Sequence, residues 1–239
     1  LEHKDSARAA AVEAVAGDWP MPVAVRINGA GSDWHSSDIA AVAQSRAVYA
    51  VIPRAASARL VRADRAALGK PVLAMIETAA GVLAAPGIAG EAAALIAGTN
   101  DLSADLRLPP DAGRAPLQTA LQSIVLAARA HGIAAFDGVC NRLEDEAGLA
   151  KECAEGRRLG FDGKSLIHPD QIAPCNSAFG PSEAEIQRAR RLVEAFSGGA
   201  MRFEDRMIEQ MHVAVAERVL RRAGARLQPF RHTDQRTLK

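Results

Sequence analysis

Two carboxylates stand where apolar segments of this chain end. Glu77 follows the apolar run 73–76, and Asp101 comes shortly after the apolar run 93–97. Equivalent ends of parallel strands lie side by side at one edge of a sheet, where two acids can hold a divalent cation. Because no His or Cys is close by, hard oxygen ligands favour Mg²⁺. The alternative is structural, with Asp101 capping a helix and Glu77 in a buried ion pair.

Two arginines also end apolar runs. Arg26 stands next to the end of the run 23–27, and its guanidinium offers a fixed fork of donors to a carboxylate or to a developing enolate oxygen. Pairing with a structural carboxylate is the alternative for this residue. Arg54 follows the run 48–52 and either faces the same site or is solvated in a loop.

Short apolar runs alternate with Ala-rich helical patterns along most of the chain. Strands are predicted at 23–27, 48–52, 71–76, 93–97, 133–136 and 163–167, and helices include 36–44, 56–68 and 117–131. Strands that are apolar on both faces and alternate with helices indicate a parallel α/β sheet. The count fits an open doubly wound sheet or an incomplete barrel. Gly29 and Gly31 lack the third glycine of a dinucleotide fingerprint, which favours a (β/α)₈ TIM barrel without its first two strands.

The pattern changes after residue 169. Ser182 and Glu185 form a capping box that opens a helix to about residue 196, and 197–199 ends it. A last amphipathic helix is predicted over 204–223, followed by a basic, frayed tail. The expected domains are therefore a barrel over 1–180 and a C-terminal helical extension over 181–239.

Composition excludes several classes of protein. The chain has 239 residues, of which 49% are hydrophobic and 4% aromatic, and its net charge of +1 gives no field for nucleic acid or an anionic membrane. No apolar run approaches the roughly 18 residues of a membrane span, and no signal-peptide pattern is visible. Three cysteines without CxxC spacing indicate reduced thiols, so we expect a cytoplasmic protein.

Several motifs together resemble the citrate lyase beta subunit group of the HpcH/HpaI aldolase superfamily, over residues 3–222. They are Val25-Arg26-Ile27-Asn28, Ile76-Glu77-Thr78, Gly98-Thr99-Asn100-Asp101-Leu102, Asp137-Gly138-Val139 and the long stretch 160–172. The resemblance implies a (β/α)₈ barrel assembled as a trimer or hexamer. It also implies cleavage or formation of a carbon–carbon bond in a 3-hydroxyacyl thioester of coenzyme A or acyl carrier protein, such as citryl, malyl or citramalyl.

The same resemblance implies roles for individual residues. Glu77 and Asp101 become the Mg²⁺ ligands, and Arg26 contacts the acyl oxygens at the metal. Lys4 and Arg8 begin a helix whose basic residues approach the phosphates of the thioester carrier in relatives.

Three positions depart from the family pattern. Arg54 stands where the family has Lys, and Asn100 where it often has an acid. In malyl-thioester lyases the last segment supplies an Asp to the site of a neighbouring subunit, and here Glu209 takes that place as a candidate acid or base. Two alternatives to the Mg²⁺-dependent lyase stay open: a class II aldolase acting on free pyruvate-type keto acids, and a non-catalytic paralogue.

Overall fold

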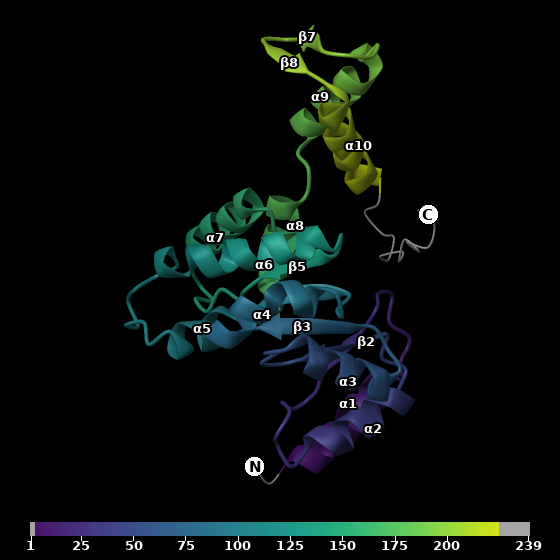
Figure 1. The fold of residues 1–239 in the computed structure, drawn as a ribbon, viewed down its shortest axis with the longest axis vertical. Coiled ribbons are helices and arrows are strands. Elements are labelled where there is room, and N and C mark those ends of the chain that lie inside the picture. Colours follow the sequence, from purple (N-terminus) through teal and green to yellow (C-terminus); the bar gives the residue numbers. More distant parts are fainter. Residues whose placement is uncertain (1–2, 225–239) are drawn as a thin grey trace. The chain divides into compact units, whose positions relative to one another are not determined.

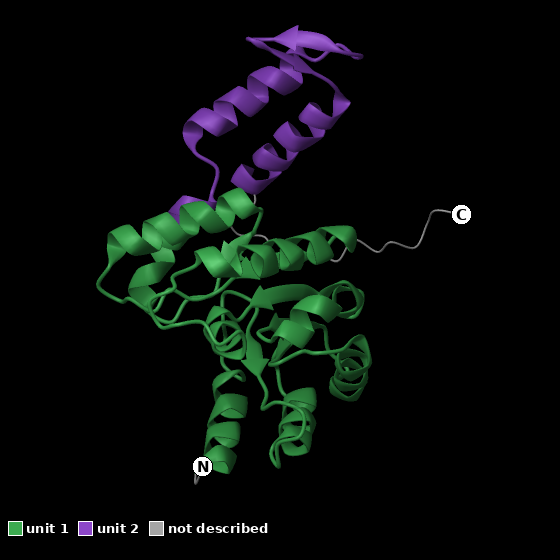
Figure 2. Cartoon of the chain, turned by 60° about the vertical axis from the view of Figure 1, so that its left-hand side comes forward, with its two compact units in different colours: residues 1–175 green, residues 176–239 purple. Residues whose placement is uncertain are grey.

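The computed structural model describes residues 3–224. The chain divides into two compact units at the boundary between residues 175 and 176 (Figures 1 and 2). The predicted frayed tail beyond Gly224 lies outside the described residues. The helix α8 (Ile172–Phe179) crosses the boundary between the units, and every other described helix and strand falls within one unit.

Unit 1 contains one parallel sheet of six strands. The strands are β1 (Ala24–Arg26), β2 (Tyr49–Ile52), β3 (Val72–Ile76), β4 (Ala94–Ala97), β5 (Ala134–Asp137) and β6 (Gly163–Lys164). They pair in the order of the sequence, which is the order of a (β/α)₈ barrel, whereas a doubly wound sheet reverses its order. The six predicted strands and the partial TIM barrel are confirmed.

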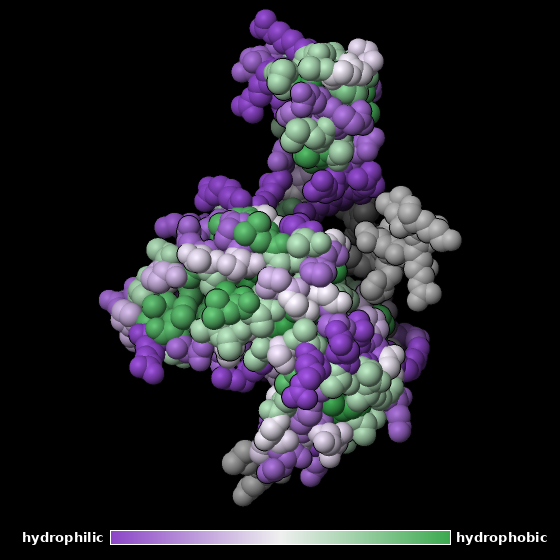
Figure 3. All heavy atoms as spheres, in the orientation of Figure 1, coloured by the Kyte–Doolittle hydropathy of each residue, from purple (hydrophilic) through white to green (hydrophobic). Residues whose placement is uncertain are grey.

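Helices alternate with these strands, one before β1 and at least one after each strand. They are α1 (Lys4–Ala14), α2 (His35–Gln44), α3 (Ala58–Leu68), α4 (Ala79–Ala89), α5 (Thr99–Asp105), α6 (Gln118–Ala130), α7 (Glu146–Leu159) and α8 (Ile172–Phe179), with short 3₁₀ turns at Ala115–Leu117 and Pro169–Gln171. Apolar side chains such as Ile52, Ile76 and Leu95 are fully buried, because they pack between the sheet and these helices. On the face drawn in Figure 3, apolar and hydrophilic patches alternate over this unit.

Unit 2 holds two helices joined by a hairpin. The helices are α9 (Glu183–Ala195) and α10 (Gln210–Gly224), and the hairpin pairs β7 (Met201–Phe203) with β8 (Arg206–Ile208). The predicted capping box of Ser182 and Glu185 is present. The prediction of a helix starting at residue 204 was wrong. Glu204 takes a left-handed φ of 54° in the turn between the two strands, and the helix begins only at Gln210.

None of the described helices is long and apolar enough to cross a membrane.

Candidate metal and substrate site

Pairing across the sheet places Arg26 and Glu77 on the same face. Arg26 pairs with Val51, which pairs with Leu73. Side chains along a strand alternate between faces, so Leu73, Met75 and Glu77 share the side that Arg26 takes. Ile76 points the opposite way and is fully buried under the helices. The two residues therefore project from the inner, barrel-lumen face of the sheet.

Glu77 is held by the backbone of the neighbouring strand end. It directly follows β3 and is only 4% exposed. Its Oε1 accepts a hydrogen bond of 2.6 Å from the backbone N–H of Arg54. Arg54 has a φ of 49°, which a non-glycine residue adopts at a cost of roughly 1 kcal/mol. This turn after β2 therefore fixes one oxygen of the carboxylate and leaves the other without a described hydrogen bond.

Gly98 makes room for the same carboxylate. A Cβ at this position would lie 2.4 Å from Cβ and 2.6 Å from Oε2 of Glu77, closer than real Cβ contacts. Gly98 follows β4 and donates its N–H to the carbonyl of Ile76 at 2.9 Å. Only glycine lets the two strand ends approach this closely.

Asp101 lies in the first turn of α5 rather than at its cap. The N-cap position belongs to Gly98, which has no capping side chain, so the capping interpretation of Asp101 was wrong. The Asp101 carboxylate lies 3.8 Å from Nη1 of Arg54, and both side chains are about 58% exposed. An exposed pair at that distance contributes little, so Asp101 keeps its oxygens available at the mouth of the barrel.

The electrostatics of this pair suit a cation. Burial raises the pKa of Glu77, the N–H of Arg54 lowers it, and the negative charge of Asp101 raises it again, so the net direction is upward. Carboxylates that repel each other gain from a positive ion between them, and an oxygen-only donor set fits Mg²⁺. Within residues 3–224 no group of three or more His, Cys, Asp or Glu side chains could hold a metal. Mg²⁺ usually keeps several waters and binds through one or two carboxylates, so water and substrate oxygens would complete its shell beside Glu77 and Asp101.

Arg26 is available to an anion. Its side chain is exposed, and its charge reaches Glu77, whose pKa it lowers. Among the described residues no hydrogen bond or ion pair engages the guanidinium, so the alternative of a structural carboxylate partner finds no support there.

Lys4 and Arg8 are engaged inside unit 1. Lys4 Nζ donates to Oδ1 of Asn28 at 2.6 Å and lies 5.4 Å from the centre of the Trp34 ring. Arg8 donates to Asp38 at 2.7 Å and to Asp5 at 2.6 Å. A guanidinium committed to two carboxylates has less to offer a phosphate, and the carrier-binding role of both residues stays a prediction.

Glu209 belongs to unit 2. It stands immediately before α10 with an exposed side chain, and its backbone N–H donates to Nδ1 of His212 at 3.0 Å. Its role as a catalytic acid or base stays a prediction.

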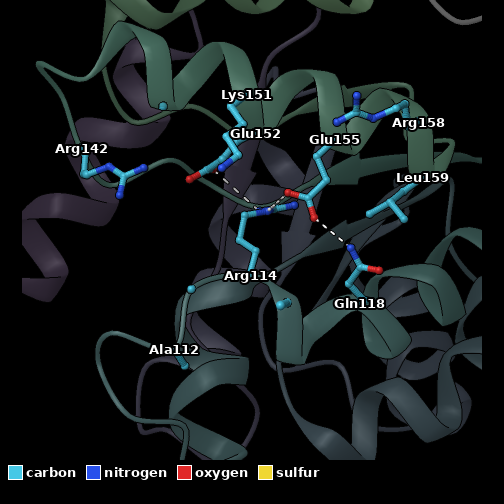
Figure 4. Close-up of a pocket in the computed structure, with 12 residues that line it drawn as sticks. Ala112, Arg114, Gln118, Arg142, Lys151, Glu152, Glu155, Arg158 and Leu159 are labelled. Atoms are coloured by element: carbon cyan, nitrogen blue, oxygen red, sulfur yellow. Dashed lines mark hydrogen bonds and ion pairs between the residues drawn. The ribbon is translucent and has the colours of Figure 1, made fainter.

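A buried ion network beneath β5 and β6 was missed by the sequence reasoning. Asp137 is fully buried and accepts hydrogen bonds of 3.0 and 2.9 Å from Arg114 and one of 3.2 Å from Lys164. Glu152 and Glu155 of α7 also face Arg114, beside a cavity of about 740 Å³ (Figure 4). Asp137 alternates with Phe136, so it points to the helices and away from the lumen. The alternation of side chains along the strand could be predicted from the sequence. Arg114 could not, because it lies in a loop that has no helical or strand periodicity.

Asn100 stands where the family often has an acid, and it is satisfied by another amide. It donates to Asn141 at 3.0 Å and accepts from Asn141 at 2.7 Å. The reciprocal pair joins the segments after β4 and β5, so the substitution leaves no unpaired group at the rim.

Fold and site together define a class, namely partial (β/α)₈ barrels with an acidic, Mg²⁺-suited site at the carboxyl ends of the strands. The chain belongs to the HpcH/HpaI aldolase/citrate lyase family, whose sequence pattern matches residues 1–169.

Named relatives agree with this assignment. The chain is 42% identical over 212 residues to a (3S)-malyl-CoA thioesterase of Cereibacter sphaeroides, covering 84% of this chain and 74% of the relative. It is 32% identical to the citrate lyase subunit beta of Leuconostoc mesenteroides, over 94% of this chain and 82% of that protein. The crystal structure of CitE from Mycobacterium tuberculosis with magnesium, acetoacetate and coenzyme A superposes with a TM-score of 0.81 and 32% identity, covering 93% of this chain and 85% of that one.

Proposed function

We propose that this protein is a Mg²⁺-dependent enzyme that acts on a 3-hydroxyacyl thioester of coenzyme A, of the malyl type, and cleaves its carbon–carbon bond. The observation that carries the proposal is the placement of Glu77, Asp101 and Arg26 at one end of the sheet. A metal held there would sit against the hydroxyacid end of the substrate. The magnesium and coenzyme A bound to the Mycobacterium tuberculosis relative support the cofactor and the substrate class.

Each residue of the site has a separate role in the proposed reaction. Mg²⁺, when bound by Glu77 and Asp101, would supply Lewis acidity toward the oxygens of the keto-acid fragment. Arg26 offers donors to the negative charge that develops on an oxygen as the bond breaks. A base takes the proton of the substrate hydroxyl, the carbon–carbon bond breaks, and the enolate of the acyl thioester is then protonated. We assign the proton transfers to Glu209, supplied by the last segment of a neighbouring copy in a trimer or hexamer.

Thioester hydrolysis is the second candidate, and one observation favours it. Four relatives at 40–42% identity are named (3S)-malyl-CoA thioesterases, whereas those named citrate lyase subunit beta share 32–35%. Hydrolysis breaks the bond between the carbonyl carbon and sulfur with water, releasing malate and a free thiol. Lyase cleavage leaves the thioester intact and releases glyoxylate.

One assay separates these reactions. The full chain is incubated with Mg²⁺ and malyl-, citramalyl- or citryl-CoA, and two products are followed: keto acid, trapped as a phenylhydrazone, and free thiol, detected with a thiol-reactive dye. Keto acid without thiol supports the lyase, and thiol without keto acid supports the thioesterase. Turnover of free hydroxy acids alone indicates the class II aldolase, and no turnover with no Mg²⁺ binding indicates a non-catalytic paralogue. Glu77→Gln, with its fold checked by circular dichroism, is the inactive control.

A further inference from the structure

Asn28, two residues after Arg26, has a partner for each of its polar groups. Its backbone N–H and its side-chain amide donate to Oδ2 of Asp38 at 2.8 and 2.6 Å. Its side-chain oxygen accepts from Lys4 at 2.6 Å, and its carbonyl faces Nδ1 of His35 at 2.8 Å. The segment that leaves β1 is therefore fixed by residues of α1 and α2.

The ring of His35 lies between two hydrogen-bond acceptors. A carbonyl can only accept, so Nδ1 must carry a proton toward Asn28. The other nitrogen, Nε2, lies 3.0 Å from Oδ1 of Asp64 on α3. If Asp64 is ionised, Nε2 must also carry a proton, and His35 is then an imidazolium.

Because His35 and Asp64 are both largely buried, the charge of each side chain depends on the charge of the other. The side chains of His35 and Asp64 are 15% and 8% exposed. The second carboxylate oxygen of Asp64 is buried without a hydrogen-bond partner. Burial works to lower the pKa of His35, but the hydrogen bonds to Asn28 and Asp64 outweigh it, and the pKa is raised. Asp38 adds a further negative charge and is itself paired with Arg8 of α1 at 2.7 Å.

We propose that His35 is a cation paired with Asp64, and that this pair is a positioning device that sets the Arg26–Asn28 segment for the substrate. The inference rests on the proposed function through Arg26, which it treats as the group that meets the substrate anion. Above the pH at which His35 loses its proton, Asp64 becomes a buried charge without a counter-ion. The segment after β1 then loses its anchor, and substrate binding weakens on the alkaline side.

The sign follows from the direction of the shift. A histidine whose pKa is raised in the folded state contributes stability that is fully present below its unfolded pKa. That contribution is lost as the pH rises through the folded pKa. We therefore expect KM to rise on the alkaline side of the pH profile. This rise follows the loss of the His35 proton and not the titration of Glu77 or Asp101.

A ligand-free experiment on the full wild-type chain tests the pair directly. Two-dimensional ¹H–¹⁵N spectra of the histidine rings report the protonation of each nitrogen from pH 5 to 10. We expect both nitrogens of His35 to be protonated at pH 7, with a midpoint above that of an unperturbed histidine. The backbone amides of residues 26–29 should shift with the same midpoint. A neutral His35 at pH 7, or amides that do not follow its titration, would overturn the proposal.

Variants supply the second test. Asp64→Asn should lower the midpoint of His35, and an unchanged midpoint contradicts the pairing. His35→Gln keeps a donor for the Asn28 carbonyl but cannot titrate. We expect it to raise KM at pH 7 about tenfold and to remove the alkaline rise of KM. His131→Gln, on an exposed residue, is the control and should leave the profile unchanged.

The two proposals fail in distinguishable ways. If no thioester is turned over, the proposed function fails, while the ring spectra and the amide shifts still decide the ion pair. If turnover is found and His35→Gln keeps the alkaline rise, the positioning role is wrong and the proposed function stands.

Discussion

Glu77 and Asp137 both end apolar strands of the same sheet, yet their surroundings are opposite. Glu77 accepts one hydrogen bond from a backbone N–H and shares its site with the exposed Asp101. Asp137 is enclosed by the cations of Arg114 and Lys164. The difference arises from the pleat, since Glu77 alternates onto the lumen face and Asp137 onto the helix face. The face that a strand-end acid takes therefore decides whether its carboxylate is left open or is enclosed by cations.

Removing the enclosed carboxylate of Asp137 is expected to have the largest effect on the free energy of unfolding. Asp137→Ala removes the fully buried carboxylate that Arg114 and Lys164 share and leaves Glu152 as their remaining common partner, and we expect a loss of about 3 kcal/mol in the free energy of unfolding. Urea denaturation followed by circular dichroism measures it, with Asp137→Asn as the milder change. A loss below about 1 kcal/mol would show that Asp137 is not a structural ion.

Glu77→Gln tests the carboxylate that no cation encloses. The amide oxygen can still accept a hydrogen bond from the N–H of Arg54, so we expect the free energy of unfolding to change by less than about 1 kcal/mol. Catalysis should fall by about 100-fold or more, because a ligand of the Lewis acid is gone. The same denaturation experiment and the product assay measure both effects. A destabilisation as large as that of Asp137→Ala would show that Glu77, like Asp137, is a structural ion.

Gly98→Ala tests how closely the open carboxylate is supported. The new methyl group would displace Glu77, and we expect Mg²⁺ affinity to fall about tenfold, as when the support of a metal ligand is lost. Gly87→Ala is the matched control, since its Cβ would meet only Cβ of Ala58 at 3.5 Å. Equal Mg²⁺ affinities in the two variants would contradict the role given to Gly98.

The smallest effect on stability is expected for Arg54→Gly. Glycine relieves the left-handed backbone, while the exposed pair with Asp101 is lost, and the two changes offset to within about 1 kcal/mol. The N–H that binds Glu77 remains. Thermal denaturation checks the stability and KM checks the substrate role, and a loss above about 2 kcal/mol would make the guanidinium a structural group.

The sequence predicted best what apolar runs determine. All six strands were found. Most are apolar segments that end at a polar residue or a turn, whereas β6 is only Gly163–Lys164, shorter than the predicted 163–167. The hairpin 201–208 was missed, since its short strands carry no buried run and the left-handed Glu204 has no signature. The pairing of Glu77 with Asp101 as metal ligands was inferred from their places at strand ends, and it stays a prediction. The network of Asn28, His35, Asp38 and Asp64 was not predicted, because its members come from three separate segments that only the fold brings together.

Isothermal titration calorimetry of the full chain with Mg²⁺ shows whether Glu77 and Asp101 form one Mg²⁺ site. We expect one site in the wild type, lost in both Glu77→Gln and Asp101→Asn and kept in Asp111→Asn, which changes an exposed loop acid. Mg²⁺ binding that survives both substitutions, or that is absent from the wild type, would contradict it.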